Sequence, residues 1–64
     1  MPAKWTGDVV GKMHLHRVTI KELAAHMGFS DRYVAMVLNG ERAPKGAEQR
    51  FTEALDALIK EARA

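Results

Sequence analysis

Apolar residues recur at intervals of three and four positions along most of this 64-residue chain, which is the spacing of one face of an α-helix. Short clusters that contain glycine or proline separate the periodic stretches. The pattern predicts four helices, which cover about residues 7–16, 20–27, 31–38 and 47–62. Because no repeat or linker interrupts them, we expect a single compact all-α domain over residues 1–64.

The first predicted helix carries its apolar face at Trp5, Val9 and Met13, which are spaced by four residues. Thr6 is the expected N-cap, since its hydroxyl can accept from a free backbone N–H of the first turn. Gly11 lies inside this helix, where glycine costs up to about 1 kcal/mol relative to alanine. We expect Gly11 to mark a close approach to another helix.

The second predicted helix has the clearest start signal of the chain. In Thr19-Ile20-Lys21-Glu22 the threonine hydroxyl can accept from the backbone N–H of Glu22 while the Glu22 carboxylate reaches back, which is a capping box. Gly28 ends the helix, where a left-handed residue is favoured. The residues expected on its buried face are Ile20, Leu23, Ala24 and Met27.

The third predicted helix follows after a turn of only three residues, 28–30. Ser30 is its expected N-cap, and Asn39-Gly40 is expected to stop it. So short a turn forces a sharp angle between the two helices and predicts tight packing at Ala24. Its expected buried residues are Val34, Val37 and Leu38.

The fourth predicted helix is the longest and the most clearly amphipathic, with most of its charged residues opposite the apolar stripe. Ile59 stands beside that stripe rather than on it. The stripe itself is formed by Phe51, Ala54, Leu55, Leu58 and Ala62.

Composition and charge narrow the function classes. The chain has no cysteine, which excludes a disulfide framework, a thiolate zinc site and a cysteine nucleophile. No apolar run is long enough to cross a membrane. The net charge of +2 is unevenly spread, since residues 1–45 carry +3 and residues 46–64 carry −1. This asymmetry favours a polyanionic partner for the first two thirds of the chain.

The segment from Val18 to Gly40 reads VTIKELAAHMGFSDRYVAMVLNG, two capped helices joined by a glycine turn. It resembles the helix-turn-helix of the lac-repressor family in the offsets of its alanine, glycine, serine and valine positions. With one helix before it and a long helix after it, the whole chain more closely resembles the phage repressor and Cro group. The resemblance covers about residues 9–60 and implies a lambda-repressor-like, XRE-type fold that binds double-stranded DNA as a transcriptional regulator, most simply a repressor.

The resemblance implies that helix 31–38 enters the major groove with its amino-terminal half at the base edges. Arg32 is the main expected reader, because a guanidinium can pair with guanine O6 and N7. Each of these residues also has a structural interpretation: Arg32 could pair with Asp31 or Glu41, and Tyr33 could pack on the last helix. Met36 could belong to the rim of the core. The predicted base-reading residues are Asp31, Arg32, Tyr33 and Met36.

Phosphate contacts are implied around the two helix starts and just past the reading helix. Two positions depart from the family patterns. Ile20 stands where the phage group has a glutamine, and Ala35 stands where the lac-type pattern has a serine, so two polar contacts are missing. The predicted phosphate-binding residues are Thr19, Lys21, Ser30, Asn39, Arg42 and Lys45.

The partners follow from the size of the domain. A single module of this kind buries roughly 600–1,000 Å² on DNA, so such modules usually bind palindromic operators as dimers. We expect a homodimer that uses the end of the last helix, with Ile59 as the candidate contact. We expect no cofactor, no metal and no enzymatic activity, since neither a catalytic constellation nor a set of metal ligands is present. His14 and His16 project about 200° apart on a helix.

Two functions remain open on sequence alone. The first is a sequence-specific DNA-binding regulator acting on the nucleoid in the cytoplasm. The second is a protein-interaction module, antitoxin-like or anchoring, that uses the same surface on a protein partner. The low net charge and the apolar residues Ile20 and Ala35 favour the second.

Overall fold

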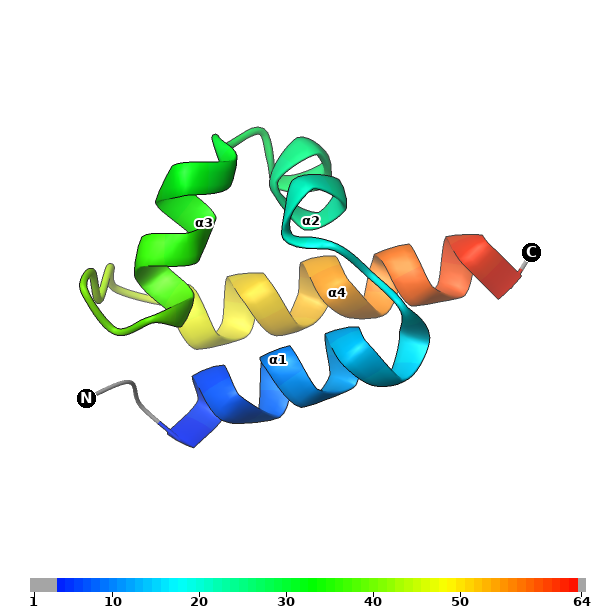
Figure 1. Cartoon of the computed structure of the whole chain (residues 1–64), viewed down its shortest axis with the longest axis horizontal. Helices are drawn as coiled ribbons and strands as arrows, with labels where there is room; N and C mark the ends of the chain where they lie inside the picture. The colour runs from blue at the N-terminus through cyan, green and yellow to red at the C-terminus, as the bar shows by residue number, and fades with distance from the viewer. Residues whose placement is uncertain (1–3, 64) are drawn as a thin grey trace.

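A computed structural model describes the backbone of residues 4–63 and the side chains of residues 4–61. The described chain forms four helices and no strand: α1 (Lys4–His16), α2 (Ile20–Met27), α3 (Asp31–Leu38) and α4 (Ala47–Arg63) (Figure 1). The predicted all-α fold is confirmed, and α2 and α3 have the predicted bounds. Residues 1–3 and 64 of the expected domain, and the side chain of Ala62, lie outside the described part. None of the described helices has the length and apolar character that a membrane span needs.

The first and last helices lie side by side and run in the same direction (Figure 1). Near their starts the rings of Trp5 and Phe51 meet edge to face, with 5.8 Å between centroids. Further along, the Lys12 ammonium pairs with the Asp56 carboxylate. Helices α2 and α3 lie across this pair, with α2 against both α3 and α4.

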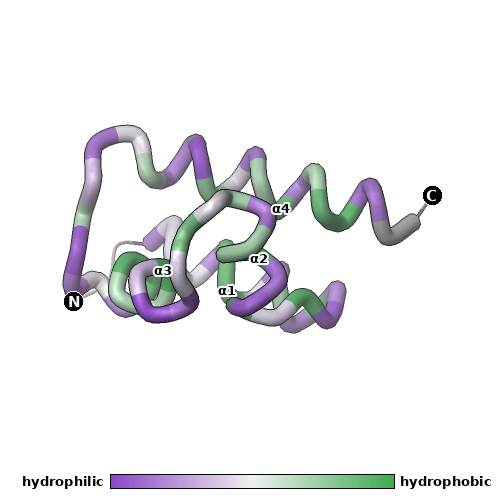
Figure 2. Tube along the Cα trace, turned by 90° about the horizontal axis from the view of Figure 1, so that it is seen from above, coloured by the Kyte–Doolittle hydropathy of each residue, from purple (hydrophilic) through white to green (hydrophobic). Residues whose placement is uncertain are grey.

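The core lies where the four helices meet. The largest side chains that are completely enclosed come from α2, α3 and α4, which is why α3 cannot rotate about its axis without exposing apolar surface. Hydrophobic and hydrophilic positions alternate around α4, as its amphipathic sequence requires (Figure 2). The most deeply buried large residues are Leu23, Val34, Val37, Phe51 and Leu55.

The first three helices end in the same hydrogen-bond pattern. The backbone N–H groups of Val18, Phe29 and Glu41 donate to carbonyls five residues earlier, those of Met13, Ala24 and Met36. This Schellman arrangement needs a left-handed residue just before each donor. Gly28 and Gly40 fill that role at φ of 80° and 84°, whereas after α1 it falls to Arg17 at φ 57°. The two glycine stops were predicted, and the left-handed arginine was not.

Four expectations about individual residues were wrong. Helix α1 begins at Lys4, so Thr6 lies inside the helix, only 3% exposed, and is not its N-cap. Gly11 is exposed, and nothing lies within 4 Å of the place where a Cβ would be, so it marks no close helix approach. Ile20 is 38% exposed because it occupies the first position of α2, ahead of the buried turn.

The fourth correction concerns α4. Ile59 is 8% exposed and belongs to the core rather than standing beside the buried stripe. The apolar side of α4 is therefore wider than the stripe that periodicity alone marks out, because both α1 and α2 pack against it.

Candidate functional site

Helices α2 and α3 form a unit whose two starts are both capped. The Thr19 hydroxyl accepts from the Glu22 backbone N–H at 3.1 Å, and the Glu22 carboxylate accepts from the Thr19 backbone N–H at 3.0 Å, so the predicted capping box is present. The Ser30 hydroxyl accepts from the Tyr33 backbone N–H at 3.1 Å. Ala24, beside the turn, is completely buried, as predicted. These contacts hold the start of α3 in one place.

One face of α3 is enclosed by the domain and the other is not. The buried side consists of Val34, Val37 and Leu38, as predicted. At the amino-terminal end Asp31 and Arg32 are exposed. Tyr33, Ala35 and Met36 are half-buried, so only part of each side chain is accessible.

The exposed cations on and near α2 and α3 form no ion pair with another described residue. In the part of the chain that the structure describes, the one ion pair within 4 Å joins Lys12 to Asp56. Arg32 is thus paired with neither Asp31 nor Glu41, the two acids considered from sequence. The remaining predicted cations, Lys21, Arg42 and Lys45, are likewise exposed and without an ion pair.

The segment after α3 is tied to the end of that helix. The Met36 carbonyl accepts from the backbone N–H of Glu41 at 2.9 Å and from that of Arg42 at 3.3 Å. Asn39 is the exposed cap residue, with helical backbone angles. Arg42 is therefore held next to the carboxyl-terminal end of α3 by its own backbone, whereas Lys45 stands three residues further along the connection.

Thr19 and Ser30, two predicted phosphate ligands, differ in whether their hydroxyl protons have an acceptor within the described chain. Thr19 Oγ1 accepts from Glu22 and lies 3.0 Å from a Glu22 carboxylate oxygen, so its proton is directed back into the cap. Ser30 Oγ accepts from Tyr33, and within the described chain its proton has no acceptor. Ser30 is consequently the better placed of the two to donate to an external oxygen.

Phe29 is the residue that sequence reasoning missed. Its ring lies 4.8 Å from that of Tyr33, tilted by 57°, and its side chain is 36% exposed. The signal was present in the sequence, since Phe29 stands just before the Ser30 cap, where an apolar residue often packs against the first turns of the helix that follows. Tyr33 also packs against the core cluster, so part of its role is structural.

Among the described residues, no three His, Asp or Glu side chains lie close enough together to hold a metal ion. The exposed site residues of this unit lie at the two ends of α3, with Asp31 and Arg32 at its start and Asn39, Arg42 and Lys45 after its end.

Comparison with known proteins adds no relative to this picture. No protein-family model, curated protein or solved structure matches the chain significantly. A functional assignment rests on the residues and their geometry.

Proposed function

We propose that this protein is a sequence-specific, double-stranded DNA-binding transcriptional regulator of the repressor type, with α2 and α3 as a lambda-repressor-like helix-turn-helix. The observation that carries the proposal is the exposed start of α3, where Arg32 forms no ion pair with any other described residue, on a helix whose opposite face is packed into the core. A helix held in this way can enter the major groove with little loss of order, since its backbone is fixed before binding.

In the proposed complex Arg32 reads a guanine through O6 and N7. Asp31 accepts from a cytosine amino group or orients Arg32, and the accessible edge of Met36 contacts a thymine methyl. Tyr33 contributes through its hydroxyl, because its ring is engaged with Phe29. These four residues lie within the first six positions of α3.

Around this helix the proposed phosphate ligands form two groups. Thr19, Lys21 and Ser30 lie at helix starts, where free backbone N–H groups and the helix dipole favour an anion. The second group, Asn39, Arg42 and Lys45, follows α3 and is exposed. Such contacts set the register on DNA without reading sequence.

We further propose a homodimer on a palindromic operator, because one module of this size buries too little DNA surface for tight specific binding. Ile59 is not the proposed dimer contact, since its side chain is buried in the core of its own subunit. A regulator of this kind acts on the nucleoid, which places the proposed location in the cytoplasm.

The test is selection from a random duplex pool, followed by salt titrations of the selected site with three variants. Arg32→Ala is expected to relax sequence preference and to cost about 1–3 kcal/mol on the selected site. Arg42→Ala is expected to weaken all sequences alike and to reduce the salt slope by about one. Lys60→Ala is the matched control, because it removes an equally exposed charge from the far end of α4 and should leave both quantities unchanged.

Equal losses from Arg32→Ala on every sequence would contradict base reading. A pool that yields no enriched site and no binding would favour the second candidate, a protein-interaction module. One observation supports that alternative. Leu15 is 78% exposed and Ile20 is 38% exposed, so both aliphatic side chains are accessible to a protein partner.

A further inference from the structure

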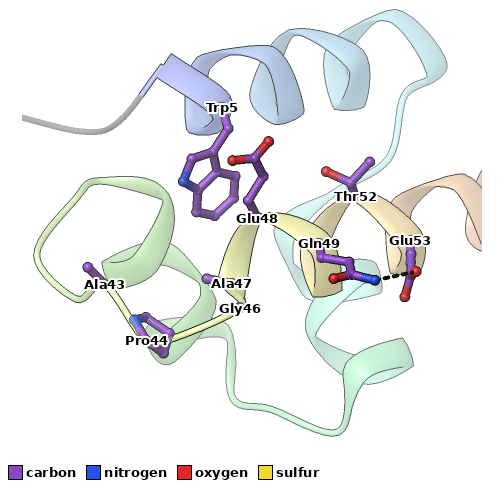
Figure 3. Close-up of a pocket in the computed structure, with 9 residues that line it drawn as sticks. All are labelled: Trp5, Ala43, Pro44, Gly46, Ala47, Glu48, Gln49, Thr52 and Glu53. Atoms are coloured by element: carbon purple, nitrogen blue, oxygen red, sulfur yellow. Dashed lines mark hydrogen bonds between the residues drawn. The ribbon is translucent and has the colours of Figure 1, made fainter.

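An open groove of about 630 Å³ lies between the starts of α1 and α4, and none of its lining residues belongs to α3 (Figure 3). Trp5 forms its wall on the α1 side, and Pro44 lies on the opposite side, in the connection before α4. The start of α4 supplies the remaining polar groups, Glu48, Gln49, Thr52 and Glu53.

The charge of the groove is opposite to that of the chain. Its charged lining residues are Glu48 and Glu53, although the whole protein carries +2. Both carboxylates are exposed, and neither is in an ion pair within the described residues. Glu53 accepts one neutral hydrogen bond, from the Gln49 amide at 3.3 Å. Lys45 lies between two lining residues in sequence, yet it does not line the groove.

Trp5, the aromatic wall of the groove, is held in place by packing against the core. Trp5 is half-buried, and its ring contacts the buried Phe51 at 5.8 Å in an edge-to-face arrangement. The Glu48 carboxylate lies near the indole (Figure 3). An indole and a carboxylate side by side offer a cation two favourable interactions at once, one with the ring face and one with the negative charge.

We propose that this groove docks a segment of a partner protein that presents an arginine flanked by apolar side chains. The guanidinium fits better than an ammonium, because it is planar, stacks on an indole and pairs with a carboxylate through two N–H groups. The apolar flanks would cover Pro44 and Ala47. The groove is open along its length, which suits an extended segment better than a small molecule, since small-molecule sites enclose most of their ligand.

This inference goes beyond the proposed DNA binding and does not depend on it. Ala43, Pro44 and Gly46 of the groove lie next to the proposed phosphate ligands Arg42 and Lys45, but no residue belongs to both sets. The peptide measurement needs no DNA, so failure of one proposal can be told from failure of the other. A regulator with both surfaces could contact DNA and a second protein at the same time.

The chain contains a single tryptophan, so the indole signal reports on the surroundings of Trp5. The probe is the peptide acetyl-Leu-Arg-Leu-amide, compared with the same peptide carrying the neutral isostere citrulline. Binding is followed by the emission of Trp5 and by the indole N–H resonance in a two-dimensional NMR spectrum. We expect the arginine peptide to bind in the millimolar range and the citrulline peptide to bind about fivefold more weakly.

The variant Glu48→Gln removes the charge beside the indole and is expected to weaken the arginine peptide by about fivefold. Glu61→Gln makes the same change near the other end of α4 and should have no effect. Thermal unfolding of both variants shows that the fold is retained. Equal affinity for the arginine and citrulline peptides, or an unchanged affinity in Glu48→Gln, would overturn the proposal.

Discussion

Phe29 and Tyr33 lie ring against ring, 4.8 Å apart, across the junction between the turn and α3. The Tyr33 backbone N–H is also the donor to the Ser30 cap. Tyr33 is thus anchored at both its backbone and its ring, and its hydroxyl is the part left to act on a partner. A residue proposed to contact DNA therefore also fixes the geometry of the turn that positions Arg32.

These two roles of Tyr33 can be separated. Tyr33→Phe keeps the ring contact and should change the free energy of unfolding by less than about 0.5 kcal/mol, while it weakens binding to the selected DNA site. Tyr33→Ala removes the ring as well and should cost about 1–3 kcal/mol of stability. Urea unfolding and DNA titration of both variants test this. Full DNA affinity in Tyr33→Phe would restrict Tyr33 to a structural role.

Two neighbouring alanines of α2 offer a matched test of helix packing. Ala24 is completely buried beside the turn, whereas Ala25 is exposed. Ala24→Leu should destabilise the domain by about 1–3 kcal/mol, because the added atoms have no free space. Ala25→Leu should stay within about 0.5 kcal/mol of the parent. Similar urea midpoints for the two variants would show that α2 is loosely packed at Ala24.

Arg17 adopts a left-handed backbone at φ 57°, a conformation that costs an L-residue about 1–2 kcal/mol. Arg17→Gly should therefore raise the free energy of unfolding, by about 0.5–1 kcal/mol after the greater freedom of glycine in the unfolded chain is subtracted. Arg17→Ala removes the same charge without relieving the backbone and should not stabilise. Calorimetry distinguishes the two, and an equal shift in melting temperature would point to charge rather than backbone strain.

The capping box at the start of α2 predicts a graded series at Thr19. Thr19→Ala removes the acceptor for the Glu22 N–H and should cost about 1 kcal/mol. Thr19→Ser keeps the hydroxyl and should lose only a few tenths of that amount. Chemical denaturation of the three proteins measures the series. If alanine and serine behaved alike, the hydroxyl would not be what stabilises this helix start.

The Lys12–Asp56 pair is expected to contribute little, although it joins α1 to α4. Its side chains are 44% and 52% exposed, so water screens the attraction. Asp56→Asn should cost less than about 1 kcal/mol in dilute buffer, and the difference from the parent should shrink in 1 M salt as screening increases. Unfolding curves at the two salt concentrations provide the measurement, and a loss that salt does not reduce would mean that Asp56 acts by packing.

The middle of the chain was the most predictable part of the fold. Both α2 and α3 begin at a side-chain cap and end before a glycine, signals that act within four or five residues and need no distant contact. For α1 the local signal was misleading, because Thr6 was expected as the N-cap and lies inside the helix. Its beginning at Lys4 places Trp5 within reach of Phe51, a contact between residues 46 positions apart that no local pattern contains.

The sequence could predict which residues form the candidate site, but not which of their side chains form ion pairs. Spacing places Arg32 on the side of α3 opposite Val34 and Val37, whereas Asp31 is exposed because it stands at the first position of the helix. Whether Arg32 pairs with an acid depends on side-chain distances, which sequence leaves open. The groove at Trp5 was not foreseen, because its walls come from segments about forty residues apart in the chain.

The sequence alone therefore determined the helical class, the bounds of α2 and α3, and which side chains face outward at the start of α3. These properties depend on periodicity and capping, which operate over a few residues. Three-dimensional packing settled how wide the buried side of α4 is, that Ile59 and Thr6 are enclosed, and that Trp5, Glu48 and Glu53 line one groove. Such features arise only when separate helices meet, and burial is a property of the whole assembly of helices rather than of any one of them.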